Sequence, residues 1–348
     1  MSLNLGIIGY GGMGFWHAQN ACNIENVNVM AAYDIFPSQV VAAEKAGLRG
    51  YSTLEEFLAD KDINTVLIAT PNNVHKELAI AAAKAGKNVI CEKPVALSVA
   101  DLDEMIAAAK DNNVLFTVHQ NRRWDKDYCI AKKVFDSGEL GKVFTVESRL
   151  HGSGGLIHGW RSLKEYGGGM VFDWGVHFLD QLLLMVPGKI NSVYTVLHSV
   201  INSEVDDYFK IILEFDSDIT IQTEVGTFCL RSLPRWFICG DKGSMTIEDF
   251  EGKGGITKVN ALAEKIEPII VNTSAGPTRT FAPQPPETRD NLELPEVTAN
   301  WTDFYRNVSK VIEGKEELIV KPAQVRRVLA LIEAVFESYE TGNTVKFE

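Results

Sequence analysis

The chain has 348 residues, enough for two domains that each bury a core of their own. Its net charge of −12 argues against nucleic acids and anionic membranes as partners. Five cysteines without a C-x-x-C pair indicate reduced thiols in a cytoplasmic protein and argue against a thiolate zinc site. Because no run of about 18 apolar residues occurs, the sequence predicts no segment that spans a membrane.

The first third of the chain, residues 1–120, alternates strand and helix. Strand-like apolar runs occur at residues 3–9, 27–34, 64–70, 88–91 and 114–120. Helical patterns separate them, which is typical of parallel strands with covering helices. The sequence therefore predicts an α/β fold whose N-terminal domain is a doubly wound parallel sheet of Rossmann type.

The remaining residues, 121–348, differ in character and are predicted to form a second domain of α+β type. Strand-like segments follow one another with short turns, at residues 141–150, 190–200, 207–215 and 219–227. This order predicts a large, mostly antiparallel open sheet. The proline-rich stretch 274–290 is predicted to be a loop without regular structure. Two helices, 301–314 and 323–342, close the chain.

A glycine-rich turn joins the first strand to the first helix. The stretch GYGGMG, residues 9–14, places Gly9, Gly11 and Gly14 in the G-x-G-x-x-G spacing. Gly9 permits a tight turn, Gly11 lets a pyrophosphate approach the backbone, and Gly14 lets helix and strand pack closely. Since a helix N-terminus favours negative charge, the turn predicts a dinucleotide site.

Asp34 follows Gly14 by 20 positions, at the end of the second predicted strand. A carboxylate there accepts hydrogen bonds from the adenine ribose hydroxyls and repels a 2′-phosphate. Ile35 and Phe36 supply no guanidinium for such a phosphate, so NAD is predicted and NADP is less favoured. The alternative is that Asp34 only begins a turn before Pro37.

A later loop at the same edge of the sheet carries further candidates. The stretch ATPNNVH would place Thr70, Pro71, Asn72 and His75 along the ribose and nicotinamide end of the cofactor. Without a comparison to a family, His75 is equally well explained as a residue at a helix start.

Asp173 and His177 are four residues apart in GGGMVFDWGVHFLDQ, residues 167–181. On a helix this spacing places both on one face, where the carboxylate can orient the imidazole for general base chemistry. The same spacing suits metal ligation with His151 or His158. A purely structural pair at the start of an amphipathic helix is the third interpretation, and the pattern alone favours it.

The stretches GIIGYGGMG, ATPNNVHKELAIAAAKAGKNVICEKP, NRRW, GGGMVFDWGVHFLDQ and ALIEAVFESYETG occur in this order along the chain. Together they resemble the glucose–fructose oxidoreductase and inositol dehydrogenase family (Gfo/Idh/MocA), nearly from end to end. The resemblance implies a dinucleotide-binding domain followed by a domain with a large, mostly antiparallel sheet. It also implies a homodimer or homotetramer formed through that sheet.

The resemblance further implies roles for single residues. The family's E-K-P motif matches Glu92, Lys93 and Pro94, and the family's lysine lies between nicotinamide and substrate. An ammonium donor there stabilises alkoxide character as a hydride leaves. The family's D-x-x-x-H motif matches Asp173 and His177, which makes His177 the proton acceptor and Asp173 its orienting partner.

The predicted site residues form three groups. The catalytic residues are Lys93, Asp173 and His177. The cofactor contacts are Gly9, Gly11, Gly12, Met13, Gly14, Asp34, Thr70, Pro71, Asn72, His75, Glu92, Lys93, Trp160 and Arg161. The candidate substrate contacts are Arg122, Arg123, His151 and His158. No metal is expected, because Lys93 supplies the electrophilic group.

These residues predict an NAD-dependent dehydrogenase that acts on a secondary hydroxyl of a sugar, sugar derivative or inositol. Two rivals stay open at this point. An NAD-dependent glycosidase of the same family would oxidise its substrate transiently and recycle the cofactor. A dinucleotide- and sugar-sensing protein would bind without catalysis, although intact Lys93, Asp173 and His177 argue against it.

Overall fold

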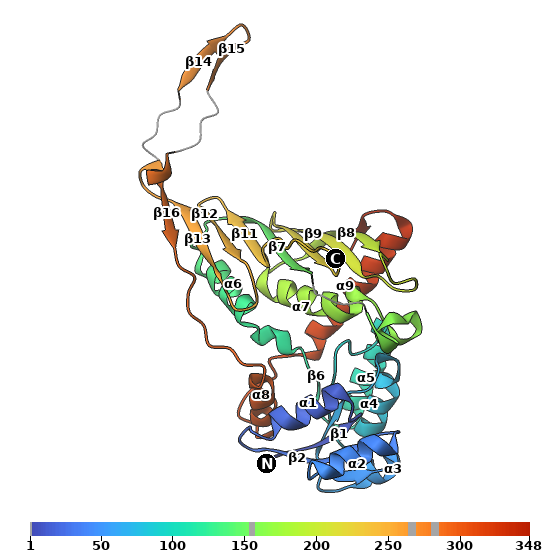
Figure 1. The fold of residues 1–348 in the computed structure, drawn as a ribbon. Coiled ribbons are helices and arrows are strands. Elements are labelled where there is room, and N and C mark those ends of the chain that lie inside the picture. The colour runs from blue at the N-terminus through green and yellow to red at the C-terminus, as the bar shows by residue number, and fades with distance from the viewer. Residues whose placement is uncertain (1, 153–156, 264–268, 280–284) are drawn as a thin grey trace.

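The computed structural model describes residues 2–152, 157–263, 269–279 and 285–348. Figure 1 shows two lobes, one built on a parallel sheet that contains the N-terminus and one built on a broad second sheet. None of the described helices is long and apolar enough to cross a membrane.

The first lobe is a six-stranded parallel sheet with the strand order β3-β2-β1-β4-β5-β6. Its strands are β1 (Leu3–Ile8), β2 (Val27–Tyr33), β3 (Arg49–Tyr51), β4 (Thr65–Ile68), β5 (Asn88–Cys91) and β6 (Phe116–Val118). The connecting helices are α1 (Gly12–Ala21), α2 (Pro37–Lys45), α3 (Leu54–Ala59), α4 (His75–Lys84) and α5 (Val99–Asp111). All four residues of β4 are buried, as expected for a central strand covered on both faces. The predicted doubly wound sheet is confirmed.

The second lobe is a nine-stranded mixed sheet with the order β16-β13-β12-β11-β7-β10-β9-β8-β17. Its strands are β7 (Val143–His151), β8 (Ile190–His198), β9 (Tyr208–Phe215), β10 (Thr220–Gly226), β11 (Trp236–Gly240), β12 (Gly243–Ile247), β13 (Gly254–Val259), β16 (Arg289–Leu292) and β17 (Val345–Lys346). Only β7 and β10 pair in parallel among the described strands of this sheet. The mostly antiparallel sheet predicted from the sequence is therefore confirmed.

Helices α6 (Lys126–Ser137), α7 (Val176–Met185) and α9 (Pro322–Thr341) pack on one face of this sheet (Figure 1). A separate hairpin of β14 (Ile270–Thr273) and β15 (Gly276–Arg279) projects away from the body. The prediction that 274–290 lacks regular structure is wrong in its described part, because β15 and the start of β16 fall within it. These residues form strands despite their turn-like composition, because the backbone of β15 pairs with β14 and that of β16 pairs with β13.

The chain returns to the first lobe after β16, before β17 completes the second sheet. Helix α8 (Asp303–Ile312) lies against α1 and β1, and α9 also contacts α5 and β6 (Figure 1). The hydroxyl of Thr117 on β6 donates to the carbonyl of Val320 at 2.8 Å. Because these late helices complete the first lobe, the division into residues 1–120 and 121–348 stays a prediction.

Candidate active site

A cavity of about 1170 Å³ lies at the carboxyl ends of the parallel strands and reaches the second lobe. The glycine-rich turn forms one wall, with Gly9, Gly11, Gly12 and Met13 lining it. Gly9 has a φ of +89°, which favours glycine. A Cβ atom on Gly14 would overlap the carbonyl oxygen of Gly9, so helix α1 can approach β1 only with glycine there. Both features fit the pyrophosphate of a dinucleotide.

Asp34 lines the same cavity just beyond the end of β2. One carboxylate oxygen accepts a hydrogen bond from the backbone N–H of Tyr10 at 2.7 Å, and the other accepts from Phe36 at 2.9 Å. These bonds fix the carboxylate beside the glycine-rich turn. Each oxygen keeps a lone pair for a further donor, as contact with a ribose hydroxyl requires.

Lys93, Asp173 and His177 come together in this cavity, from the two lobes of the molecule. The Lys93–Pro94 peptide is cis. The Lys93 ammonium donates to the Asp173 carbonyl at 2.8 Å and to its carboxylate at 2.9 Å. Arg161 Nε lies 3.6 Å from the same carboxylate. The ammonium is therefore positioned by Asp173, across the cleft between the lobes.

The structure differs from the expected pairing of Asp173 with His177. Residues Val171–Gly175 form a π-helical turn before α7 begins at Val176. Both side chains still line the same cavity. The Asp173 carboxylate pairs with Lys93 instead, and His177 Nδ1 has no hydrogen-bond partner among the described residues.

The environment sets the charges of this group for proton transfer. Burial, followed by the nearby charges of Lys93 and Arg122, holds the pKa of His177 well below its usual value, so its imidazole is neutral at pH 7. Burial alone would raise the pKa of Asp173, but the charge and hydrogen bond of Lys93 outweigh it and lower that pKa. The site thus holds a neutral base next to an ion pair.

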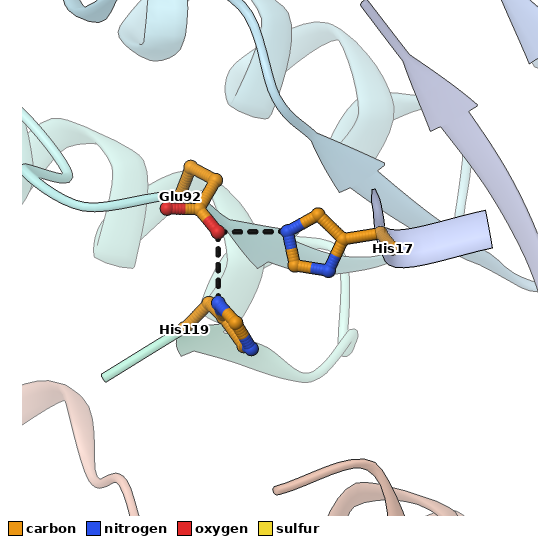
Figure 2. A group of neighbouring side chains, drawn as sticks. All are labelled: His17, Glu92 and His119. Atoms are coloured by element: carbon orange, nitrogen blue, oxygen red, sulfur yellow. Dashed lines mark hydrogen bonds and ion pairs between the residues drawn. The ribbon is translucent and has the colours of Figure 1, made fainter. Parts of the chain in front are cut away.

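Behind the Lys93 turn, the Glu92 carboxylate is held by two buried histidines (Figure 2). His17 Nε2 on α1 and His119 Nδ1 after β6 lie 2.7 and 2.8 Å from the same Glu92 oxygen. The other oxygen accepts from the Lys93 backbone N–H at 3.0 Å, and the Tyr305 hydroxyl on α8 lies 2.6 Å from His17 Nδ1. The network ties α8, α1 and β6 to the residue that precedes Lys93.

These three groups have the donor types of a metal site, but hydrogen bonds account for their distances. A neutral His17 donates from Nε2 to Glu92 and accepts from Tyr305 at Nδ1. Burial alone would raise the pKa of Glu92, but the charge of His119 and the hydrogen bonds of both histidines hold it well below its usual value. An ionised Glu92 carboxylate with two imidazole donors therefore accounts for these distances, while His119 Nε2 has no hydrogen-bond partner among the described residues.

The network predicts that the protein loses stability in mild acid. Burial, then the charge of His119, lowers the pKa of His17 to about 4, against about 6.5 in an unfolded chain. Between these pH values the unfolded chain binds a proton that the folded chain does not, so the free energy of unfolding falls as pH falls. The loss expected from His17 is roughly 3 kcal/mol between pH 7 and pH 4.

Urea unfolding at a series of pH values measures this loss. The His17→Gln variant should show a flatter pH dependence than the wild type. His198→Gln, at an exposed histidine on β8, should not change the slope. Equal slopes in all three proteins would contradict a neutral buried His17.

Most predicted site residues line the cavity. They are Gly9, Gly11, Gly12, Met13, Asp34, Thr70, Pro71, Asn72, Glu92, Lys93, Arg122, Trp160, Arg161, Asp173 and His177. The Asn72 amide donates to the Tyr166 carbonyl at 3.1 Å, which links this loop to the second lobe. Gly14 is not in the wall, and its lack of a side chain lets helix α1 pack against the Gly9 backbone.

Four predicted residues lie elsewhere. His75 is fully buried, and its ring nitrogens each lie 3.0 Å from a carbonyl oxygen, of Thr70 and of Pro94, so it supports these loops rather than facing the cofactor. Arg123 is buried in a two-bond ion pair with Asp180. His151 accepts from the Leu233 backbone and lies 3.4 Å from Glu224, and His158 is exposed outside the cavity wall. The substrate role predicted for the last three is not supported by their positions.

Sequence reasoning missed several aromatic residues of the wall. Trp16, Tyr166, Trp174 and Trp301 all line the cavity. Trp16 follows the glycine-rich turn closely, and Trp174 follows Asp173 directly. Their place in the cavity wall could therefore have been predicted from these motifs. Trp301 carries no such signal, because it reaches the site only through the return of the chain at α8.

A Rossmann sheet with a glycine-lined cavity, completed by a second lobe, is the architecture of a dinucleotide-binding oxidoreductase. The family description "Oxidoreductase family, NAD-binding Rossmann fold" matches residues 3–120, and "GFO/IDH/MocA C-terminal domain" matches residues 128–246. The chain therefore belongs to the Gfo/Idh/MocA family of NAD(P)-dependent dehydrogenases, as the motifs predicted.

Known proteins agree with this placement. The crystal structure of an NAD-binding protein from Listeria innocua is 44% identical, has a TM-score of 0.92, and covers 99% of this chain and 100% of its own. An uncharacterized oxidoreductase of Schizosaccharomyces pombe is 31% identical over 85% of this chain and 84% of its own. The scyllo-inositol 2-dehydrogenase (NADP(+)) IolW of Bacillus subtilis is 26% identical over 85% of this chain and 82% of its own.

Proposed function

We propose that the protein oxidises a secondary hydroxyl of a sugar, sugar derivative or inositol, with NAD as the hydride acceptor. The observation that carries the proposal is the Lys93 ammonium, held by Asp173 in the cavity that contains both His177 and the glycine-rich turn. The likeness to IolW, whose name gives scyllo-inositol as its substrate, supports a polyol.

Each residue of the site has a separate role in the proposed reaction. Bound nicotinamide supplies the acceptor for the hydride that leaves the substrate carbon. Neutral His177 takes the hydroxyl proton, because its lowered pKa leaves a free base at pH 7. Lys93 donates a hydrogen bond to the substrate oxygen and stabilises its negative charge as the carbonyl forms. Asp173 holds the ammonium in place.

Absorbance of NADH during incubation with a panel of sugars and inositols tests the proposal. Steady NADH formation with NAD and one polyol is the expected result. Release of an aglycone without net NADH would instead favour a glycosidase that recycles its cofactor. Dinucleotide binding with no turnover of any panel member would favour a sensor.

Preference for NAD over NADP rests on Asp34, whose fixed carboxylate would repel a 2′-phosphate. Asp34→Asn removes the charge while keeping an oxygen acceptor. We expect the ratio of kcat/KM with NADP to kcat/KM with NAD to rise about tenfold or more, since like charges in contact are costly. Glu55→Gln, at an exposed carboxylate on α3, should leave the ratio unchanged. A wild-type preference for NADP would refute this role.

We also propose a cytoplasmic location and an assembly of identical copies. The described cysteines are all unpaired, which supports a cytoplasmic protein. The nine-stranded sheet carries α6, α7 and α9 on one face, while Tyr194 on β8 is 41% exposed. We propose that the sheet joins two or four copies, and light scattering of the purified protein measures the number.

A further inference from the structure

A second hollow of about 630 Å³, here called the annex, adjoins the main cavity. The two share Trp16, Arg122, Trp174 and Trp301 as a common wall. The annex volume lies within the ~300–1,000 Å³ that is usual for small-molecule sites. The reaction proposed above takes place in the main cavity and assigns no ligand group to the annex.

Five aromatic side chains line the annex, together with seven polar or charged residues. Four of the chain's six tryptophans line it, and Phe250 adds a fifth ring. The residues that carry these rings are each half-buried, and the Arg122 guanidinium covers part of the Trp174, Phe250 and Trp301 rings, so the ring surface that Arg122 leaves uncovered is open to the hollow. The four tryptophans are Trp16, Trp124, Trp174 and Trp301. Such rings gain free energy when a ligand covers their faces.

The annex begins close to the reacting groups. The ring of Trp174 lies 6.3 Å from the ring of His177, centroid to centroid, and Trp174 follows Asp173 directly in the chain. A ligand group in the annex is therefore near enough to be joined to a ring that contacts His177 and Lys93.

The charges of the annex are already paired within the protein. The Arg122 guanidinium lies 4.1 Å from the Trp174 ring centroid and forms an ion pair with Asp125 at 3.0 Å. Asp125 also accepts from Trp301 Nε1 at 2.7 Å. Lys126 and Glu251, of opposite charge, are exposed at the rim. No net positive charge is thus directed at a phosphate or carboxylate, and a neutral ligand fits better.

We propose that the annex binds a second, uncharged sugar ring linked to the ring that is oxidised. The C–H faces of a pyranose are apolar and match the tryptophan faces, while its hydroxyls point to the rim. The preferred substrate is then a neutral glycoside of two rings rather than a free monosaccharide or inositol. This inference rests on the proposed polyol dehydrogenase function.

Matched substrate pairs test it with the full-length protein and NAD. Glucose is compared with neutral glucose disaccharides, and myo-inositol with a galactosyl inositol. We expect at least one two-ring substrate to exceed its single-ring partner tenfold or more in kcat/KM. Equal or better turnover of single rings would overturn the annex inference and leave the dehydrogenase standing. If no substrate of the panel is oxidised, the proposed function fails. Calorimetric titration of the NAD-loaded protein then tests the annex inference separately. It requires two-ring ligands to bind at least tenfold more tightly than their single-ring partners.

A variant that fills the annex gives a second test. Ala299→Trp adds bulk to its wall without removing any existing contact of the main cavity. We expect the two-ring to single-ring ratio of kcat/KM to fall at least tenfold. Tyr339→Ala, which truncates an exposed aromatic side chain on α9 away from both hollows, should leave the ratio unchanged. An unchanged ratio in Ala299→Trp would overturn the inference.

Discussion

Replacing Lys93 by methionine is expected to lower kcat by about 100- to 1,000-fold, the usual cost of losing a donor to a developing oxyanion. Methionine keeps the length of the side chain and removes the ammonium. The Kd for NAD should change less than about threefold, because the glycine-rich turn and Asp34 remain. Steady-state NADH formation measures kcat, and quenching of tryptophan fluorescence on NAD addition measures Kd.

The same substitution leaves the half-buried Asp173 with Arg161 as its remaining partner, so stability has to be followed as well. A double variant, Lys93→Met with Asp173→Asn, removes the unpaired charge and should restore thermal stability without restoring turnover. Lys76→Met, at a lysine on α4 that pairs with Asp101 and Glu104 outside the cavity, should behave like the wild type. Turnover retained in Lys93→Met would exclude the electrophilic role.

Local motifs made much of the site predictable. The glycine-rich turn, Asp34 and the Lys93 turn each follow a parallel strand, and the carboxyl ends of such strands meet at one edge of the sheet. Their meeting could therefore be inferred from strand order alone. The neutral state of His177 could not, because it depends on burial and on the charges of Lys93 and Arg122, which only the packed structure supplies.

Some side chains have partners in the structure that the sequence did not indicate. The spacing of Asp173 and His177 suggested that the carboxylate orients the imidazole, but in the structure the carboxylate pairs with Lys93. Arg123 and His151 were plausible substrate contacts by composition. In the structure Arg123 forms an ion pair with Asp180, and His151 Nε2 lies 3.4 Å from the Glu224 carboxylate. The sequence shows which residue types are present, but it does not show which ion-pair or hydrogen-bond partner each side chain has in the fold.

Contacts between residues far apart in the chain also could not be predicted from the sequence. Tyr305 and Trp301 stand near the C-terminal end of the chain, yet Tyr305 contacts His17 and Trp301 lines both hollows. Helix α8 is recognisable as a helix from its pattern, but nothing in that pattern says that it packs on α1. The support of the Lys93 turn by Glu92, His17 and Tyr305 therefore emerges only in three dimensions.

Replacing Gly14 by alanine is expected to destabilise the protein itself by about 3 kcal/mol or more. The added Cβ would overlap the carbonyl oxygen of Gly9, and backbone atoms cannot rotate away as a side chain does. Helix α1 must then shift from β1, which also displaces His17 from Glu92. Thermal unfolding without cofactor should show a lowered Tm, and NAD affinity should fall as a consequence.

Gly11→Ala separates this packing role from cofactor binding. A Cβ on Gly11 would meet no atom within 4 Å, and its φ of −76° suits an alanine. The variant should keep the wild-type Tm without cofactor, yet bind NAD at least tenfold more weakly, because the methyl group occupies space that the pyrophosphate needs. Weak binding with an unchanged Tm in Gly11→Ala, beside a lowered Tm in Gly14→Ala, would assign one glycine to the ligand and the other to the fold. Unaltered NAD affinity in Gly11→Ala would instead place the pyrophosphate away from this turn.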